Sequence, residues 1–174
     1  MIQIDIDLTD TESIDSAIAE IQRYAQRFDE RCKLLCERLG EIGSDVLRAT
    51  YAVAPYAGTN DVSVSMEPID NGYRISANGS ALGFIEFGTG IGYPLGEYAG
   101  MVGAPGHGTY GKGQGAHPPW TYVGDPGDMG TIIATTERGT IVRTSGNPPA
   151  NAFPNAVQAM QENFIQVASE VFGR

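Results

Sequence analysis

The sequence is poor in the residues that build disulfide frameworks and metal sites, with two cysteines and two histidines among 174 residues. Two cysteines are too few for the dense set of disulfides that holds small secreted domains together. The chain also lacks any run of about 20 apolar residues, which a membrane-spanning helix requires. We therefore expect a soluble chain that is made in a reducing compartment.

Positive charge is scarce as well, since 11 basic residues stand against 21 acidic ones and leave a formal charge of −10. Proteins that bind DNA, RNA or anionic membranes through charge need basic surfaces. The composition therefore argues against specific nucleic-acid binding and against membrane association. The acidic surplus fits a conduit that DNA crosses without sticking, and it equally fits a role in solubility.

Charged residues make up 18% of the chain, whereas 41% of its residues are hydrophobic. Disordered chains have the opposite balance, with low hydrophobicity and high charge. A typical domain takes about 100–200 residues. The sequence therefore predicts a single domain over residues 1–174.

The first eight residues alternate between apolar and polar side chains, which is typical of a half-buried strand. Because this segment carries acidic residues, we expect no signal peptide. Thr9, Asp10 and Ser13 then offer N-cap oxygens for a following helix. The apolar positions of the expected strand are Ile2, Ile4, Ile6 and Leu8, and the polar ones are Gln3, Asp5 and Asp7.

The clearest pattern is a heptad seam, in which apolar residues are spaced alternately four and three positions apart. It predicts a long helix, or two helices in phase, of roughly 50 Å that ends at Pro55. Two interpretations stay open: the seam packs on the protein's own sheet, or it forms a self-standing coiled coil. Its members are Ile14, Ile18, Ile21, Ala25, Phe28, Cys32, Leu35, Leu39, Ile42, Val46 and Ala49.

Short alternating segments predict strands after this helix. The segments 61–67 and 73–77 flank turn residues at 70–72, and a third strand at 81–87 would complete an antiparallel meander. Further strands are expected at 120–123, 131–136 and 140–143, with the last two joined as a hairpin.

A closing amphipathic helix is expected to begin near Pro154, since proline suits the first helical position. We expect its apolar stripe to pack on the sheet beside the first helix. The predicted fold is thus α+β, with an antiparallel sheet packed against a long N-terminal helix and a C-terminal helix. The stripe consists of Phe153, Val157, Met160, Phe164, Val167 and Val171.

The segment 88–119 interrupts this pattern as a glycine-rich insertion. Eleven of the 28 residues from 88 to 115 are glycine, and no periodicity is present. Loops of this length in compact domains are usually functional or disordered. We expect a flexible loop that a partner can fix.

The same segment contains the string Gly-His-Gly-Thr-Tyr-Gly at residues 106–111, which matches a dinucleotide-binding motif. That motif needs a strand before it and a helix after it, but residues 112–119 are rich in glycine and proline. A P-loop interpretation fails too, because Gly113 stands where Ser or Thr would bind magnesium. We therefore expect no nucleotide cofactor.

Cys32 and Cys36 lie four residues apart on one helical face, and His107 and His117 lie ten apart in the loop. A structural zinc site needs four ligands, which no second pair completes, so the core interpretation of the cysteines is favoured. Two histidines in a flexible loop do not preorganise a catalytic metal site. The sequence therefore predicts no metal and no catalytic residue.

Glu86 is a candidate of another kind, because this acid leads into a Gly-Thr-Gly turn. Such a carboxylate usually accepts backbone N–H bonds of the turn. A role at a subunit contact is the alternative. The candidate structural or interface residues are Glu86, Phe87, Gly88, Thr89, Gly90, Phe153 and Pro154.

The order of these features resembles the neck or tail-completion family of tailed bacteriophages, over nearly the whole chain. The family's Glu-Phe-Gly-Thr segment is present at residues 86–89. Its Pro-hydrophobic-x-Thr-Gly segment corresponds to residues 55–59, where Gly and Thr are inverted. Its Pro-Phe start of the last helix corresponds to residues 152–154, where the order also differs.

The resemblance implies a structural virion protein without enzymatic activity or cofactor. Such a protein is made in the host cytoplasm and joins capsid connector and tail at the head–tail junction of a phage or prophage. It acts as a homo-oligomeric ring, for which a hexamer is one arrangement, and DNA passes through it as cargo.

Alternatives stay open in the same class and in others. A tail terminator or a minor capsid protein is the alternative within the virion. A small metal-dependent hydrolase would use His107 and His117, and a glycan-binding module would use Trp120 and Tyr122.

Overall fold

The computed structural model describes residues 4, 6–7, 9–95, 97–104, 106, 108–109 and 112–173. As predicted, the fold is α+β, with a long N-terminal helix, a C-terminal helix and antiparallel sheets. No helix in these ranges is long and apolar enough to span a membrane. The elements are α1 (Thr11–Ala52), β1 (Ser63–Ile69), β2 (Gly72–Asn78), α2 (Leu82–Phe87), α3 (Glu97–Met101), the 3-10 turn η1 (Gln114–Ala116), β3 (Trp120–Val123), β4 (Thr131–Thr136), β5 (Gly139–Thr144) and α4 (Ala152–Phe172).

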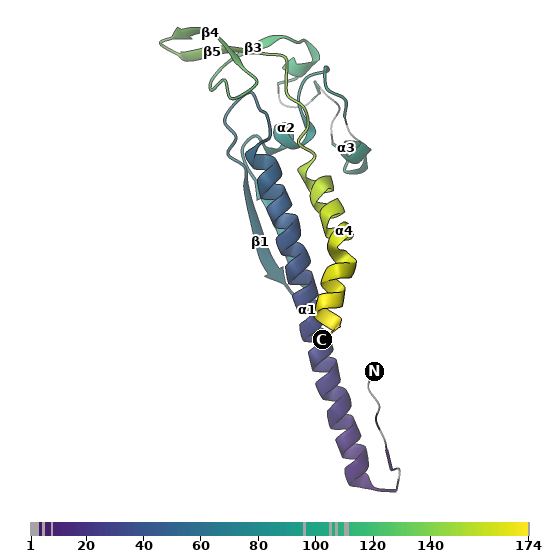
Figure 1. Cartoon of the computed structure of the whole chain (residues 1–174). Helices are drawn as coiled ribbons and strands as arrows, with labels where there is room; N and C mark the ends of the chain where they lie inside the picture. The colour runs from purple at the N-terminus through teal and green to yellow at the C-terminus, as the bar shows by residue number, and fades with distance from the viewer. Residues whose placement is uncertain are drawn as a thin grey trace.

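The helix α1 dominates the shape of the molecule (Figure 1). It begins after Asp10, whose side chain accepts a hydrogen bond from the backbone N–H of Glu12 at 3.1 Å. Its 42 residues correspond to about 63 Å at 1.5 Å per residue. The helix α4 and the β1–β2 hairpin lie beside its C-terminal half, whereas its N-terminal half projects past the end of α4 (Figure 1).

Two glycines let these neighbours approach α1 closely. A Cβ atom at Gly43 would lie 2.9 Å from Met160 Sδ of α4 and 3.1 Å from Ile75 Cδ1 of β2. A Cβ atom at Gly40 would lie 3.0 Å from Met66 Sδ of β1. Glycine weakens a helix by about 1 kcal/mol relative to alanine, so close packing is what these positions gain in return.

The core lies where the C-terminal end of α1 meets α2 and the start of α4. Leu47 and Ile85 are among the largest fully buried side chains there. Burial of an aliphatic side chain of this size contributes about 1.5–3 kcal/mol. The buried cluster consists of Leu47, Tyr51, Ala54, Ala81, Ile85, Ala152 and Ala156.

The strands form two separate antiparallel sheets. The hairpin of β1 and β2 pairs Met66 with Ile75 and turns at residues 70–71, as predicted. The second sheet has the order β3-β5-β4, so β3 and β4 are its edges. It lies beyond the C-terminal end of α1, at the opposite end of the molecule from the start of that helix (Figure 1). The predicted strands at 120–123, 131–136 and 140–143 are confirmed as β3, β4 and most of β5.

The predicted third strand of the meander is wrong, because residues 82–87 form the helix α2. A strand would point Ile85 and Glu86 to opposite faces. Both side chains are instead buried, Ile85 in the core and Glu86 against the start of α4. A single helical turn allows both contacts, which a strand does not.

The predicted N-terminal strand is absent at the residues that the structure describes. Ile4, Ile6 and Asp7 belong to no strand, and Ile6 is exposed. Asp7 instead forms the turn into α1, where its carboxylate accepts the backbone N–H of Thr9 at 2.9 Å. Residues 1, 2, 3, 5 and 8 lie outside the described part of the chain. A strand needs a pairing partner, and neither sheet includes Ile4, Ile6 or Asp7.

The C-terminal helix is confirmed, but the expectation that it packs on the sheet is wrong. The helix α4 packs along α1, with Ala156 and Val167 among its buried residues. Two members of the predicted stripe, Val157 and Phe164, are exposed. Met160 of the stripe lies against Gly43 of α1 and Val171 is buried as well, so the packed face keeps part of the stripe and adds small alanines to it.

The glycine-rich segment 88–119 contains two short elements, α3 and η1. The backbone N–H of Ile91 donates to the carbonyl oxygen of Gly115 at 3.2 Å and so links the two ends of the segment. Residues 96, 105, 107, 110 and 111 lie outside the described part, so the flexibility of this loop stays a prediction.

Candidate functional site

The Glu86 side chain caps the N-terminus of α4. It is 2% exposed, and its Oε2 and Oε1 atoms accept the backbone N–H groups of Ala152 at 2.9 Å and Phe153 at 3.1 Å. The residue at the N-cap position, Asn151, makes no side-chain capping bond. The first N–H groups of a helix have no partner within it, and a carboxylate there also meets the positive end of the helix dipole. Glu86 thus supplies a cap from 66 residues away in sequence.

Tyr51, near the end of α1, completes this arrangement. Its hydroxyl donates to Glu86 Oε2 at 2.9 Å, and Tyr51 is itself 2% exposed. Burial above all, and then the nearby Glu86 carboxylate, raise the pKa of Tyr51 well above its usual range. Tyr51 is therefore a protonated donor at neutral pH, and the pair ties α1 and α2 to α4.

The turn after Glu86 packs against the segment that precedes α4. Thr89 and Asn147 exchange backbone hydrogen bonds of 2.9 and 3.2 Å. Gly88 and Gly90 have φ angles of 76° and 80°, and a Cβ atom at Gly88 would lie 2.8 Å from Pro149 N. Glycine adopts this left-handed backbone without strain, which explains both positions.

Most of the residues selected from the sequence therefore meet in one joint, between the turn at 86–90 and the start of α4. Phe87 instead stacks on Tyr98 of α3, with the ring centroids 6.0 Å apart. Pro154 is the third residue of α4, next to Phe153. The buried Asn147 was missed by sequence reasoning, although its Nδ2 donates to the carbonyl oxygen of Phe84 at 3.1 Å. Only its place between glycine and proline could have suggested a special turn. The contacts of this joint are those of a structural element.

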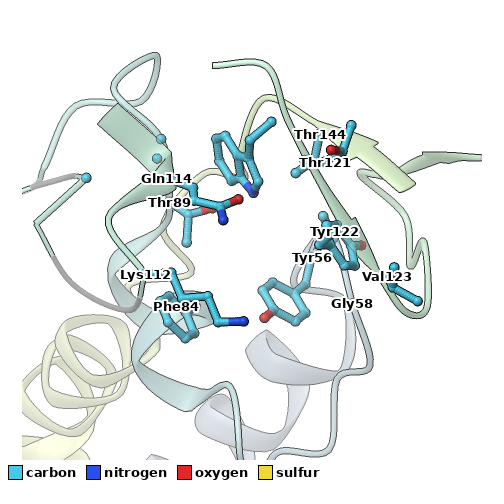
Figure 2. A pocket seen from close by; sticks show the side chains of 15 residues that line it. Tyr56, Gly58, Phe84, Thr89, Lys112, Gln114, Thr121, Tyr122, Val123 and Thr144 are labelled. Atoms are coloured by element: carbon cyan, nitrogen blue, oxygen red, sulfur yellow. The ribbon is translucent and has the colours of Figure 1, made fainter. Parts of the chain in front are cut away.

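A cavity of about 800 Å³ lies next to this joint. Ligand pockets usually have volumes of about 300–1,000 Å³. Among the lining residues that the structure describes, Lys112 alone is charged, and Figure 2 shows the amine end of Lys112 and the Tyr56 ring pointing toward each other. The cavity is thus largely apolar with a single cation. Its aromatic lining residues are Tyr56, Phe84, Trp120 and Tyr122.

The cavity follows the edge strand β3, all four residues of which line it. On one side β3 pairs with β5, and within the described ranges no backbone hydrogen bond reaches its other edge. An unpaired edge presents N–H and C=O groups to which a further strand can add. The cavity therefore combines apolar walls with free backbone donors and acceptors.

The wall of the cavity around Tyr122 is held by hydrogen bonds. The Tyr122 hydroxyl donates to the carbonyl oxygen of Asp125 at 2.6 Å. The Asp125 carboxylate accepts the Thr59 hydroxyl at 3.0 Å and the backbone N–H of Gly127 at 3.0 Å. The Gly127 N–H first, and then the Thr59 hydroxyl, lower the pKa of Asp125. These bonds join the segment after α1 to the loop after β3.

A second surface of interest is the seam of α1. Its C-terminal half packs on β1, β2 and α4, in line with the first interpretation of the seam. Between residues 21 and 30, by contrast, every side chain is exposed. We call the following three residues the free seam, with exposed fractions of 48%, 53% and 48%: Ile18, Ile21 and Tyr24. Phe28 is also 47% exposed, but its ring contacts that of Phe172 of α4, with the ring centroids 5.7 Å apart.

The residues considered for metal binding do not meet in the described part of the chain. No group of three or more His, Cys, Asp or Glu side chains there is placed to hold an ion. His117 is exposed, and His107 lies outside the described residues. Cys32 and Cys36 are free, partly buried thiols on α1.

Comparisons of the chain with models of known protein families, with curated proteins and with solved structures found no match.

Proposed function

We infer that this chain is a structural protein of a tailed-phage virion. It acts at the head–tail junction as a neck or tail-completion component, and it assembles with copies of itself into a ring that joins the capsid connector to the tail. The resemblance of the sequence to that family supports the proposal, and DNA is then a passing cargo of the acidic ring.

The observation that carries the proposal is the free seam on the projecting half of α1. Exposed apolar patches of this kind mark interaction surfaces, because burying them removes apolar area from water. The outer face of α4 offers another apolar surface, which includes Val157, Phe164 and Ile165. Contacts between two different surfaces of one chain are heterologous, and such contacts close into rings when the rotation permits.

Sedimentation velocity over a range of concentrations tests self-assembly. We expect the wild-type chain to form oligomers as its concentration rises. Ile21→Glu should weaken these oligomers, because it places a charge where the contact between copies would bury an apolar side chain. Ile69→Glu is the matched control, since Ile69 is also exposed but lies at the tip of the β1–β2 hairpin. A wild-type chain that stays monomeric at all concentrations, and with connector and tail proteins added, contradicts the proposal.

Labelling of the protein in intact virions tests its position. We expect the label between the capsid and the tail tube. A label confined to the end of the tail assigns the chain as a tail terminator, and a label over the capsid assigns it as a minor capsid protein. Either result replaces the assignment to the neck but keeps the chain as a protein of the virion.

A further inference from the structure

We propose that residues 1–6 of one copy, the arm, add as a strand to the free edge of β3 in a second copy and place their isoleucines in the aromatic cavity. This inference rests on the proposed self-assembly and names a second contact between copies, beside that of the free seam. The acceptor is a strand edge that is unpaired within the described ranges and lies along a cavity of about 800 Å³.

The donor segment has the sequence pattern of a strand, but its described residues belong to no strand. Residues 1–6 read Met-Ile-Gln-Ile-Asp-Ile, in which isoleucine alternates with polar residues. This period of two suits a strand with one apolar face. Ile4 and Ile6 lie outside any strand, and Ile6 is exposed. An alternating segment of this kind gains hydrogen bonds and apolar burial only when it finds a partner edge.

The arm cannot reach the cavity of its own chain. Asp7 is tied to the start of α1 through a 2.9 Å bond from its backbone N–H to Ser13 Oγ. Six extended residues span at most about 22 Å. The cavity lies past the far end of α1, which is about 63 Å long at 1.5 Å per residue, as Figure 1 shows for β3. Pairing of arm and cavity is therefore intermolecular and head-to-tail, which is the geometry of rings.

The chemistry of the two surfaces is complementary. Trp120, Tyr122 and Phe84 provide an apolar lining for the isoleucine face of the arm. The arm carries one carboxylate, Asp5, and the lining carries one ammonium group, Lys112. In a chain with a net charge of −10, this lysine makes the cavity a favourable place for an acidic segment.

The backbone of β3 can accept a strand in a defined register. The backbone N–H of Gly124 donates to Thr140 of β5 at 2.9 Å. Because N–H groups alternate along an antiparallel strand, those of Thr121 and Val123 point to the free edge. Main-chain bonds to an added strand give affinity, and pockets for its alternate side chains give specificity.

Complementary variants test this contact by analytical ultracentrifugation. The donor variant, Ile4→Pro with Ile6→Pro, removes the strand character of the arm, and the acceptor variant, Thr121→Pro, removes an outward N–H from an edge where proline is tolerated. We expect each variant alone to lose the higher oligomers. An equimolar mixture should restore one arm contact for each pair of copies, because the acceptor variant's arm enters the donor variant's intact cavity, and it should therefore sediment faster than either variant alone.

The single tryptophan gives a direct readout, since Trp120 lines the cavity. A peptide with the sequence of residues 1–8 is added to the donor variant, whose cavity is unchanged, and Trp120 fluorescence is recorded. We expect a saturable shift to shorter wavelength, and none with a peptide of the same composition in which the alternation is scrambled. This titration remains decisive if Thr121→Pro does not fold.

Each outcome decides a separate point. Undiminished oligomers of the donor variant overturn the arm contact and leave self-assembly standing. A monomeric wild type that still shows a peptide-dependent Trp120 shift supports the arm site and overturns the ring. No shift with the peptide, or a shift with N-acetylglucosamine in its place, overturns the proposal; the latter assigns the cavity to a glycan.

Discussion

The Tyr51 hydroxyl lies 2.9 Å from Glu86 Oε2, and the same oxygen accepts the backbone N–H of Ala152 at 2.9 Å. One carboxylate thus receives a donor from the end of α1 and two from the first turn of α4. Glu86, on the short helix α2, thus links the end of α1 to the start of α4. Four predictions about stability follow from the packing around this joint and from α1.

Replacing the carboxylate should destabilise the fold. Glu86→Ala leaves the Tyr51 hydroxyl and two helix N–H groups without their acceptor, so we expect the free energy of unfolding to fall by about 2–4 kcal/mol. Urea denaturation followed by circular dichroism measures it. Glu162→Ala is the control, because Glu162 is exposed on α4 and should change stability by no more than about 0.5 kcal/mol. Equal effects of the two variants would contradict the capping role.

Tyr51 should make stability depend on alkaline pH. Its pKa is raised in the folded chain, so the unfolded chain loses the proton first, near its ordinary pKa of about 10. The stabilisation from Tyr51 is therefore complete below about pH 10 and falls as the pH rises above that value. We expect the difference in unfolding free energy between wild type and Tyr51→Phe to shrink between pH 9 and about pH 11.5.

Comparison with the Phe variant isolates Tyr51 from the other tyrosines with raised pKa, because they occur in both proteins. A difference that stays constant over this pH range would show that the Tyr51 hydroxyl ionises equally in both states.

Gly88 and Gly83 lie close to Glu86 in sequence, and their replacement by alanine should change stability in opposite directions. At Gly88, φ is 76° and a Cβ atom would lie 2.8 Å from Pro149 N, so Gly88→Ala should lower stability by about 1–3 kcal/mol. At Gly83, within α2, a Cβ atom would meet nothing within 4 Å. Gly83→Ala should raise stability by up to about 1 kcal/mol, because alanine favours a helix. Thermal denaturation of both variants checks that Gly88→Ala lowers the melting temperature and that Gly83→Ala raises it.

Ser44 on α1 should be better replaced by alanine. Its side chain is 1% exposed, and its Oγ atom has no hydrogen-bond partner within the described part of the chain. Ser44→Ala removes this buried hydroxyl and improves helix propensity, for an expected gain of about 1 kcal/mol. Ser16→Ala is the control, since Ser16 is exposed on the same helix and gains only from propensity. A loss of stability in Ser44→Ala alone would indicate that the hydroxyl is paired.

Local patterns predict the long helices and the two hairpins well, because their periods and turn residues lie within short stretches of sequence. The segment 81–87 shows where such patterns fail. Its apparent alternation covers few residues, and the contact that decides its structure joins Glu86 to Ala152, which is distant in sequence. The face of α4 that packs on α1 likewise depends on contacts between residues distant in sequence, such as that between Met160 and Gly43.

The cavity is harder to predict than the joint. The Glu-Phe-Gly-Thr string draws attention to Glu86, and Gly88 and Gly90 indicate an unusual backbone there. Tyr56, Lys112 and Trp120, by contrast, come from three separate segments, and no spacing rule relates them. These residues line the cavity together with β3, and only the strand order β3-β5-β4 shows that β3 is an edge strand.

The projecting half of α1 acts as a spacer whose length can vary independently of the rest of the molecule. Apart from Ala17, the buried residues of α1 begin at Gly40, so the core places little constraint on the number of residues before it. Removing one heptad there would draw the N-terminal end about 10 Å closer to the sheets while keeping the same helical face in register. In the proposed ring, such a change would alter the distance between neighbouring subunits and leave the joint at Glu86 unchanged.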